Sequence, residues 1–91
     1  MNSTKIEATI LRLLQTHGEM AGLAMISAAP DVLRRGTIYV TLAAMEEKGW
    51  VSSEMKPTTE PFSRPLRRYY SITPLGAGIH ADSVLAAQEV E

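Results

Sequence analysis

The stretch LRRGTIYVTLAAMEEKGWVSSE, residues 33–54, decides the fold. Its apolar residues recur at the spacing of one helical face and predict a helix over residues 37–48, with three inward side chains: Ile38, Leu42 and Met45. Gly49 follows as a natural C-terminal cap, because glycine readily adopts the left-handed backbone that ends many helices. From Trp50 onward apolar and polar residues alternate, which is typical of a β-strand. We therefore expect a helix joined to a strand through one glycine.

Two further helices are predicted before this stretch. Thr4 and Glu7 have the spacing of a capping box, in which each side chain accepts a hydrogen bond from the other residue's backbone N–H, and Gly18 ends the helix. The apolar face of this first helix comprises Ile6, Ile10, Leu13 and Leu14. A second, shorter helix is expected over residues 20–28, closed by Pro30, with these inward residues: Met20, Leu23 and Ile26. The chain is thus expected to begin with three short helices.

A hairpin and a last helix complete the prediction. Residues 68–72 are rich in strand formers and would pair with the strand that starts at Trp50. Between them lies KPTTEPFSRPLR, residues 56–67, whose three prolines cannot donate hydrogen bonds within a central ladder, so we expect a long hairpin tip. Thr73 and Pro74 form a helix start, because the hydroxyl caps free N–H groups and proline suits the first turn. The predicted fold class is mainly α with a small antiparallel β ribbon.

The composition is that of a single folded domain with an uneven charge. The 91 residues are 45% hydrophobic and 21% charged, which differs from disordered chains and suffices for one core. The formal net charge is −1, but residues 34–72 hold seven basic and four acidic side chains, a local +3. The rest of the chain holds two basic and six acidic side chains, a local −4. Only one surface would therefore attract an anion.

Neither enzyme nor membrane features stand out in the sequence. The chain has no cysteine and only two separate histidines, His17 and His80, so we expect no catalysis, no metal site and no cofactor. The longest uncharged apolar run, residues 20–29, is about half the roughly 20 residues that a membrane helix needs. No signal peptide is apparent, and we expect a cytoplasmic protein.

The order helix, helix, helix, strand, tip, strand is that of a winged helix-turn-helix, whose third helix enters the major groove of DNA while the hairpin, or wing, contacts the backbone. Side chains of the 37–48 helix that face away from the core are candidates for base contacts: Thr37, Tyr39, Val40, Thr41 and Ala44. Glu47 would repel phosphate, so we expect only the N-terminal half of the helix to enter the groove. Phosphate contacts are expected from arginines of the preceding turn and the wing: Arg34, Arg35, Arg64, Arg67 and Arg68.

The helix after Thr73 carries apolar residues on two sides, so a monomer would leave apolar surface exposed. We expect a homodimer with this helix at its centre, and the predicted interface residues are Leu11, Ile79, Val84, Leu85 and Val90. Residues 1–73 would form the winged helix-turn-helix domain, and residues 74–91 the dimerisation helix of the same compact unit. Two-fold symmetry would require a pseudo-palindromic operator.

Simpler alternatives stand beside these assignments. The arginines could be solvated surface residues, and Arg68 could pair with an acid near the core, because it shares a strand face with Tyr70. Tyr39 could pack between the helix and the wing instead of contacting DNA. For the whole chain, the alternatives to a DNA-binding repressor are a winged helix that serves only as a protein-interaction module and one that binds RNA.

Two linked motifs also resemble the signature of a known family. GTIYVTLAAMEEKGWVSSE at residues 36–54, followed by RRYYSITPLG at residues 67–76, is similar to the PadR-like transcriptional regulators. The matching residues of the first motif are Gly36, Thr37, Ile38, Tyr39, Leu42, Met45, Glu46, Glu47 and Gly49. Those of the second motif are Arg67, Tyr69, Tyr70, Ile72, Thr73 and Gly76.

The resemblance covers roughly residues 5–78. It implies a homodimeric DNA-binding repressor whose C-terminal helix dimerises and whose effectors are often phenolic acids or other small aromatic compounds. The sequence departs from the family pattern in three places. Val40 stands where proline is usual, AGLA at residues 21–24 stands where His-Gly-Tyr-Glu is common, and the wing carries prolines and no glycine.

Overall fold

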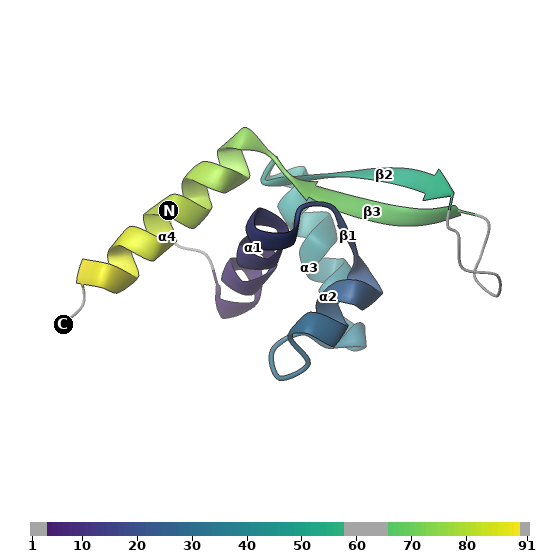
Figure 1. The fold of residues 1–91 in the computed structure, drawn as a ribbon, viewed down its shortest axis with the longest axis horizontal. Helices are drawn as coiled ribbons and strands as arrows, with labels where there is room; N and C mark the ends of the chain where they lie inside the picture. The colour runs from purple at the N-terminus through teal and green to yellow at the C-terminus, as the bar shows by residue number, and fades with distance from the viewer. Residues whose placement is uncertain (1–3, 58–65, 90–91) are drawn as a thin grey trace.

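Four helices and a three-stranded antiparallel sheet form the part of the chain described by the computed structural model, residues 4–57 and 66–89 (Figure 1). In chain order the elements are α1 (Lys5–His17), β1 (Met20–Ala21), α2 (Gly22–Ala28), α3 (Arg35–Glu47), β2 (Val51–Pro57), β3 (Leu66–Ile72) and α4 (Pro74–Glu89). The predicted fold class, a mainly α winged helix-turn-helix, is confirmed, although the ribbon has three strands instead of two.

The first helix forms as its sequence predicts. The Thr4 hydroxyl accepts a hydrogen bond from the Glu7 backbone N–H at 3.1 Å, and the Glu7 carboxylate accepts one from the Thr4 backbone N–H at 2.9 Å. Gly18 ends α1 with a φ of 80°, a backbone conformation that side chains other than glycine rarely adopt. The predicted capping box and C-terminal cap are therefore confirmed.

The prediction of one helix over residues 20–28 is wrong at its start. Met20 and Ala21 form β1, which pairs with Tyr70 and Tyr69 of β3, and α2 begins only at Gly22. Of the residues predicted to face inward, Met20 and Ile26 are partly buried against the core, whereas Leu23 is 37% exposed and Met25 is fully buried instead. The extra strand covers the edge of β3 that a two-stranded ribbon would have left unpaired.

The turn between α3 and β2 has the expected form. The inward side chains of α3 are fully buried, as predicted: Ile38, Leu42 and Met45. Gly49 has a φ of 82°, and the Trp50 backbone N–H donates to the Met45 carbonyl at 2.9 Å, so the chain leaves the helix directly into the strand. At its other end α3 begins at Arg35, two residues earlier than the 37–48 prediction.

The hairpin is longer than its sequence predicts. β2 and β3 pair in continuous register from Val51 with Ile72 to Pro57 with Leu66. The predicted tip over residues 56–67 is therefore wrong at both ends, because residues 56–57 and 66–67 belong to the strands. Residues 58–65, with Arg64 among them, lie outside the described residues. Pro57 is accommodated because it lies in β2, an edge strand of the sheet.

The core lies between the first three helices and the adjoining part of the sheet (Figure 1). Its buried members are Ile10, Leu11, Leu13, Leu14, Met25, Leu33, Ile38, Leu42, Met45, Trp50, Val51 and Tyr70. The β2–β3 hairpin and α4 extend from opposite ends of this body (Figure 1). The two extensions are thus available for different contacts.

The start of α4 is bound to the turn between α3 and β2. The Thr73 hydroxyl caps the helix by accepting from the Gly76 backbone N–H at 3.0 Å, as predicted, and it donates to the carbonyl oxygens of Gly49 (2.6 Å) and Trp50 (3.0 Å). A Cβ atom at Gly76 would collide with the Trp50 carbonyl oxygen, so the two backbones approach as closely as glycine allows.

Candidate nucleic-acid interface

The outer face of α3 is exposed where the sequence predicts base contacts. Val40 is 73% exposed, Tyr39 is 47% exposed and Thr37 is exposed, whereas Thr41 and Ala44 are half-buried. The Thr41 hydroxyl donates to the Thr37 carbonyl at 3.0 Å, so its oxygen keeps acceptor capacity toward an outside partner. This face offers a methyl-bearing side chain and hydroxyls, the groups that contact base edges in a major groove.

Two arginines mark the N-terminal end of this face. Arg34 is the N-cap residue of α3 and Arg35 is its first residue, and both side chains are exposed. Neither guanidinium forms an ion pair with any residue that the structure describes. The helix start adds unpaired backbone N–H groups and the positive end of the helix dipole. Together they make a site suited to phosphate oxygens.

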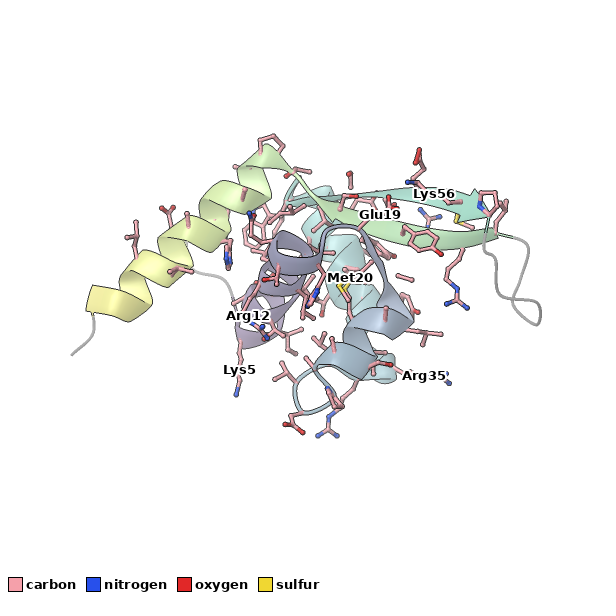
Figure 2. All side chains as sticks on the ribbon, viewed as in Figure 1. Lys5, Arg12, Glu19, Met20, Arg35 and Lys56 are labelled. Atoms are coloured by element: carbon pink, nitrogen blue, oxygen red, sulfur yellow. The ribbon has the colours of Figure 1, made fainter. Side chains whose placement is uncertain are left out.

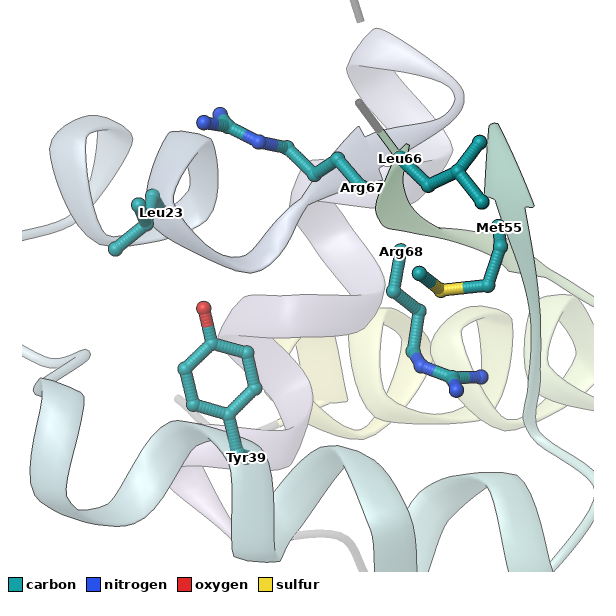
Figure 3. Close-up of a pocket in the computed structure, with 6 residues that line it drawn as sticks. All are labelled: Leu23, Tyr39, Met55, Leu66, Arg67 and Arg68. Carbon is teal, nitrogen blue, oxygen red and sulfur yellow. The ribbon is translucent and has the colours of Figure 1, made fainter. Parts of the chain in front are cut away.

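A groove of about 440 Å³ separates α3 and α2 from the wing (Figure 3). Its lining residues are Leu23, Tyr39, Met55, Leu66, Arg67 and Arg68. Because neighbouring side chains of a strand point to opposite faces, Arg67 and Arg68 leave β3 in different directions, yet both border this groove (Figure 3). The Tyr39 hydroxyl points from α3 toward the same space (Figure 3). The groove therefore has arginines on its wing side and a phenol on its helix side.

Arg68 is linked to α3 through a serine. Its Nη1 donates to the Ser53 hydroxyl at 2.9 Å, and Ser53 donates to the Glu46 carboxylate at 2.7 Å. The alternative that Arg68 pairs with an acid near the core is not observed among the described residues, where its hydrogen bond to Ser53 lies on the exposed surface. Glu46 lies close enough to offset part of the Arg68 charge, and the chain of hydrogen bonds connects β3, β2 and α3.

Tyr39 lies against α2 as well as bordering the groove. An ideal Cβ built on Gly22 would lie 2.8 Å from the Tyr39 Cε1 and 2.9 Å from its hydroxyl oxygen. Nearby, Tyr70 is buried beneath the wing, as expected for a ribbon residue packed on the helices. Burial raises the pKa of the Tyr70 hydroxyl, so this phenol stays protonated. Of these two tyrosines, Tyr39 is the exposed one, at 47% against 5% for Tyr70.

Lys56 is paired with two carboxylates of the chain itself. Its ammonium lies 2.8 Å from the Glu19 carboxylate and 3.6 Å from that of Glu54, and the hydrogen bond to Glu19 raises the pKa of Lys56 (Figure 2). The other positive groups of the candidate interface are Arg34 and Arg35 at the start of α3 and Arg67 and Arg68 beside the groove. Sequence reasoning missed the apolar groove residues, because Leu23 has the spacing of a core residue and Met55 and Leu66 carry no charge signal.

The predicted dimer residues lie in four different settings. Leu11 is fully buried in the core of the chain itself, which corrects its assignment to an interface, because no side-chain surface is left for a second copy. Ile79 is half-buried against the core, whereas Val84 and Leu85 are 41% and 55% exposed on α4. Val90 lies outside the described residues.

A second groove, of about 380 Å³, lies where α4 leaves the body. It is mainly apolar and lined by Lys48, Trp50, Leu75 and Ile79. The Lys48 ammonium lies 4.4 Å from the centre of the Trp50 ring.

Within the described residues, no cluster of histidine, cysteine, aspartate and glutamate could hold a metal ion. No helix in residues 4–57 and 66–89 has the length and hydrophobicity of a membrane span.

Comparison with known proteins places this geometry in a family. The model of the transcriptional regulator PadR-like family matches residues 10–80. A PadR family transcription regulator from Clostridium difficile R20291 is 20% identical with a TM-score of 0.79, and the match covers 93% of this chain and 88% of that chain. A PadR-like transcription factor from Bacteroides fragilis is 22% identical with a TM-score of 0.78, covering 93% and 82% of the two chains.

Bacillus subtilis PadR, solved in complex with operator DNA, is 18% identical with a TM-score of 0.78. The match covers 89% of this chain but only 47% of the longer B. subtilis chain. Among curated proteins, none matches the chain. The structural matches show a shared fold, and the family model spans well over half of the sequence. The chain therefore belongs to the PadR-like family of transcriptional regulators.

Proposed function

We propose that the protein is a sequence-specific DNA-binding transcriptional regulator that acts as a repressor. The observation that carries this proposal is the surface that joins α3 to the wing: Arg34 and Arg35 are exposed at the start of α3, and Tyr39 of α3 borders the same groove as Arg67 and Arg68. A solved complex of B. subtilis PadR with operator DNA supports the same role for this chain.

In the proposed complex the N-terminal half of α3 enters the major groove. Thr37, Val40 and Thr41 would meet base edges, with the Val40 methyl groups suited to the methyl group of thymine. The arginines would contact phosphates on either side, and these contacts orient the protein without reading sequence. Glu46 and Glu47 carry negative charge at the other end of the helix, which keeps that end away from the phosphates.

The proposed regulator is a homodimer. Val84, Leu85 and Leu75 expose apolar side chains on α4, which extends from the body and could pack against the same helix of a second copy. Residues 1–73 would then be the DNA-binding unit and residues 74–91 the dimerisation helix. Two recognition helices would lie about 34 Å apart and require a pseudo-palindromic operator.

Release from the operator by a small aromatic effector is the last part of the proposal. The support is the mainly apolar groove next to α4, which is lined by Lys48, Trp50, Leu75 and Ile79. A ligand in this groove would contact both α4 and the turn that follows α3.

A second candidate function is a protein-interaction module without DNA binding. The observation that favours it is the set of exposed apolar residues in the groove beside the wing: Leu23, Met55 and Leu66. Such a module would not need Arg34 and Arg35 at the start of α3, which form no ion pair with any described residue. An RNA-binding winged helix is a further alternative and would prefer single strands over duplexes.

One experiment separates these functions. Selection of bound duplexes from a random pool should enrich a pseudo-palindrome, and the affinity for that duplex should then be measured as salt is raised. A dimer that neutralises about six to eight phosphates should give a slope of log K against log salt near −5 to −7. A slope near zero would favour the protein-interaction module, and preferential binding of single-stranded RNA would favour the third function.

A further inference from the structure

The backbone conformation at position 22 does not require a glycine. Gly22 is the first residue of α2, and its φ is not positive, so any residue could adopt its conformation. Alanine would in fact be the better helix former. The lack of a side chain matters only for what lies above it, and the atoms nearest to an added Cβ all belong to the Tyr39 ring.

The contact between Gly22 and Tyr39 joins the two helices of the helix-turn-helix. Tyr39 Cε1, its hydroxyl oxygen and its Cζ lie 2.8, 2.9 and 3.0 Å from the position that a Cβ on Gly22 would take. These distances are too short for a real Cβ, so a methyl group at residue 22 would push the ring away. Because the tyrosine is 47% exposed and the colliding atoms are at its far end, the ring can move without disturbing the core.

We propose that Gly22 is a positioning residue that sets the direction of the Tyr39 hydroxyl, and thereby the base that Tyr39 contacts. The Tyr39 ring packs directly against the backbone of α2 at Gly22, and the Tyr39 hydroxyl points toward the groove bordered by Arg67 and Arg68 (Figure 3). Without this support, the exposed ring would sample several rotamers and lose the geometry that a specific hydrogen bond needs. This inference rests on the proposed DNA binding.

The test uses the full chain and the duplex that the wild-type protein selects from the random pool, together with duplexes that change one base pair at a time. Four proteins are compared: wild type, Gly22→Ala, Tyr39→Ala and the double variant. Gly22→Ala should reduce discrimination by about tenfold at one position of each half-site, which is within the range expected for the loss of one base contact. Tyr39→Ala should abolish base discrimination at the same position. In the double variant, Gly22→Ala should cause no further loss of discrimination.

Two further readouts separate positioning from folding. The Tm of Gly22→Ala should stay close to that of the wild type, and that of the double variant should be no lower than that of Tyr39→Ala. In the free wild-type protein, nuclear Overhauser effects should connect the Gly22 Hα protons with the Tyr39 ring. Tyr39→Phe keeps the ring and should retain these effects while losing the hydrogen bond of the hydroxyl.

Each alternative outcome overturns the inference in a recognisable way. Additive effects of the two substitutions on discrimination would mean that Gly22 acts independently of Tyr39. Destabilisation by Gly22→Ala in both backgrounds, or no contact between Gly22 and the Tyr39 ring in the free protein, would make the glycine a structural residue only. A wild-type protein that selects no duplex would instead contradict the proposed DNA binding, and with it this role of Tyr39.

Discussion

Arg35 is the residue at which the proposed phosphate contacts can be tested most directly. Its side chain is exposed at the first position of α3 and has no ion pair among the described residues. Arg35→Ala should weaken binding to every duplex and make the salt slope of the dimer shallower by about 1.8, the share of two phosphate contacts, one from each protomer. Fluorescence anisotropy at several salt concentrations measures both quantities.

Arg12→Ala is the matched control, because Arg12 is exposed on α1 and lies well away from Arg35 in Figure 2. It should change neither the affinity nor the slope by a comparable amount. Equal effects of the two substitutions would mean that only total charge matters, and the assigned DNA-binding surface would be wrong.

Two glycines of α4 offer a matched pair for stability. Gly76→Ala would drive a Cβ into the Trp50 carbonyl oxygen and should lower the free energy of unfolding by about 2–3 kcal/mol, the upper part of the range for overpacking. Gly78 has no atom within 4 Å of an added Cβ, so Gly78→Ala should stabilise the helix by up to about 1 kcal/mol. Urea unfolding of both variants checks the difference, and equal values would refute the close approach at Gly76.

Single residues were predictable where a local rule governs them. The capping pair Thr4 and Glu7 and the positive φ values of Gly18 and Gly49 follow from the few residues around them. Leu11 was not predictable in the same way. It lies outside the main apolar stripe of α1, and a helical wheel cannot show that other elements cover the helix on more than one side.

At the scale of elements, the hydrogen bonds from Arg68 through Ser53 to Glu46 should restrain the wing. The negative charge of Glu46 should also offset part of the positive charge that Arg68 presents to DNA. Glu46→Gln should therefore tighten DNA binding by about two- to fivefold, which corresponds to the 0.4–1 kcal/mol of an exposed charge interaction. Anisotropy titrations of this variant test the effect. In an Arg68→Ala background the gain should shrink, and a gain of the same size in both backgrounds would show that Glu46 acts without Arg68.

The ion pair between Glu7 and Lys48 joins the start of α1 to the end of α3. The Lys48 ammonium lies 2.7 Å from the buried Glu7 carboxylate. Burial raises the pKa of Glu7, but the hydrogen bonds from Lys48 and Thr4 together outweigh it, so the pKa lies below its ordinary value of 4.5. A lowered pKa stabilises the fold fully above about pH 4.5, and this contribution is lost as the pH falls through the folded-state pKa.

Lys48→Met should weaken or reverse that pH dependence, because burial, which raises the pKa of Glu7, is then opposed only by the hydrogen bonds with Thr4. At pH 7 the variant should lose about 1 kcal/mol, the lower end of the cost of leaving a buried acceptor unpaired, because Lys48 is half-exposed and solvent screens its charge. The difference between the two proteins should then shrink as the pH falls below 4.5, since a protonated Glu7 needs no cation. Urea unfolding between pH 3 and pH 7 measures the profile, and parallel curves would contradict the assignment.

The elements themselves were predictable to different degrees. α1 and α3 have enough turns for their apolar period to be read, and the α3–β2 turn carries its own glycine signal. β1 has two residues, too few to show a period, and it forms only because β3 offers a free edge. The groove beside the wing depends on side chains from α2, α3, β2 and β3, so no local pattern could indicate it.

At the scale of the whole molecule, dimerisation decides whether two recognition helices act together. Leu85→Arg places a charge on the exposed apolar surface of α4 and should give a monomer in sedimentation at tens of micromolar. Affinity for the full operator should fall toward that of a half-site, by roughly 10²- to 10⁴-fold. Gln15→Arg adds the same charge at an exposed position of α1 and should leave the dimer intact. A wild-type protein that is itself monomeric would refute the proposed assembly.

The close junction of Gly76 with Trp50 affects how such a dimer could adjust its reach. The first turn of α4 is held by close packing and hydrogen bonds against the turn between α3 and β2. A tilt of α4 therefore cannot be absorbed by a flexible hinge at its N-terminal end. Each protomer would rotate as one rigid body. A rotation of a few degrees about the symmetry axis of the dimer would move each α3 by several ångströms relative to the DNA. Operators whose half-sites are moved apart by one base pair should therefore be bound much more weakly. A small molecule bound beside Trp50 would act by changing the distance between the two α3 helices of the dimer.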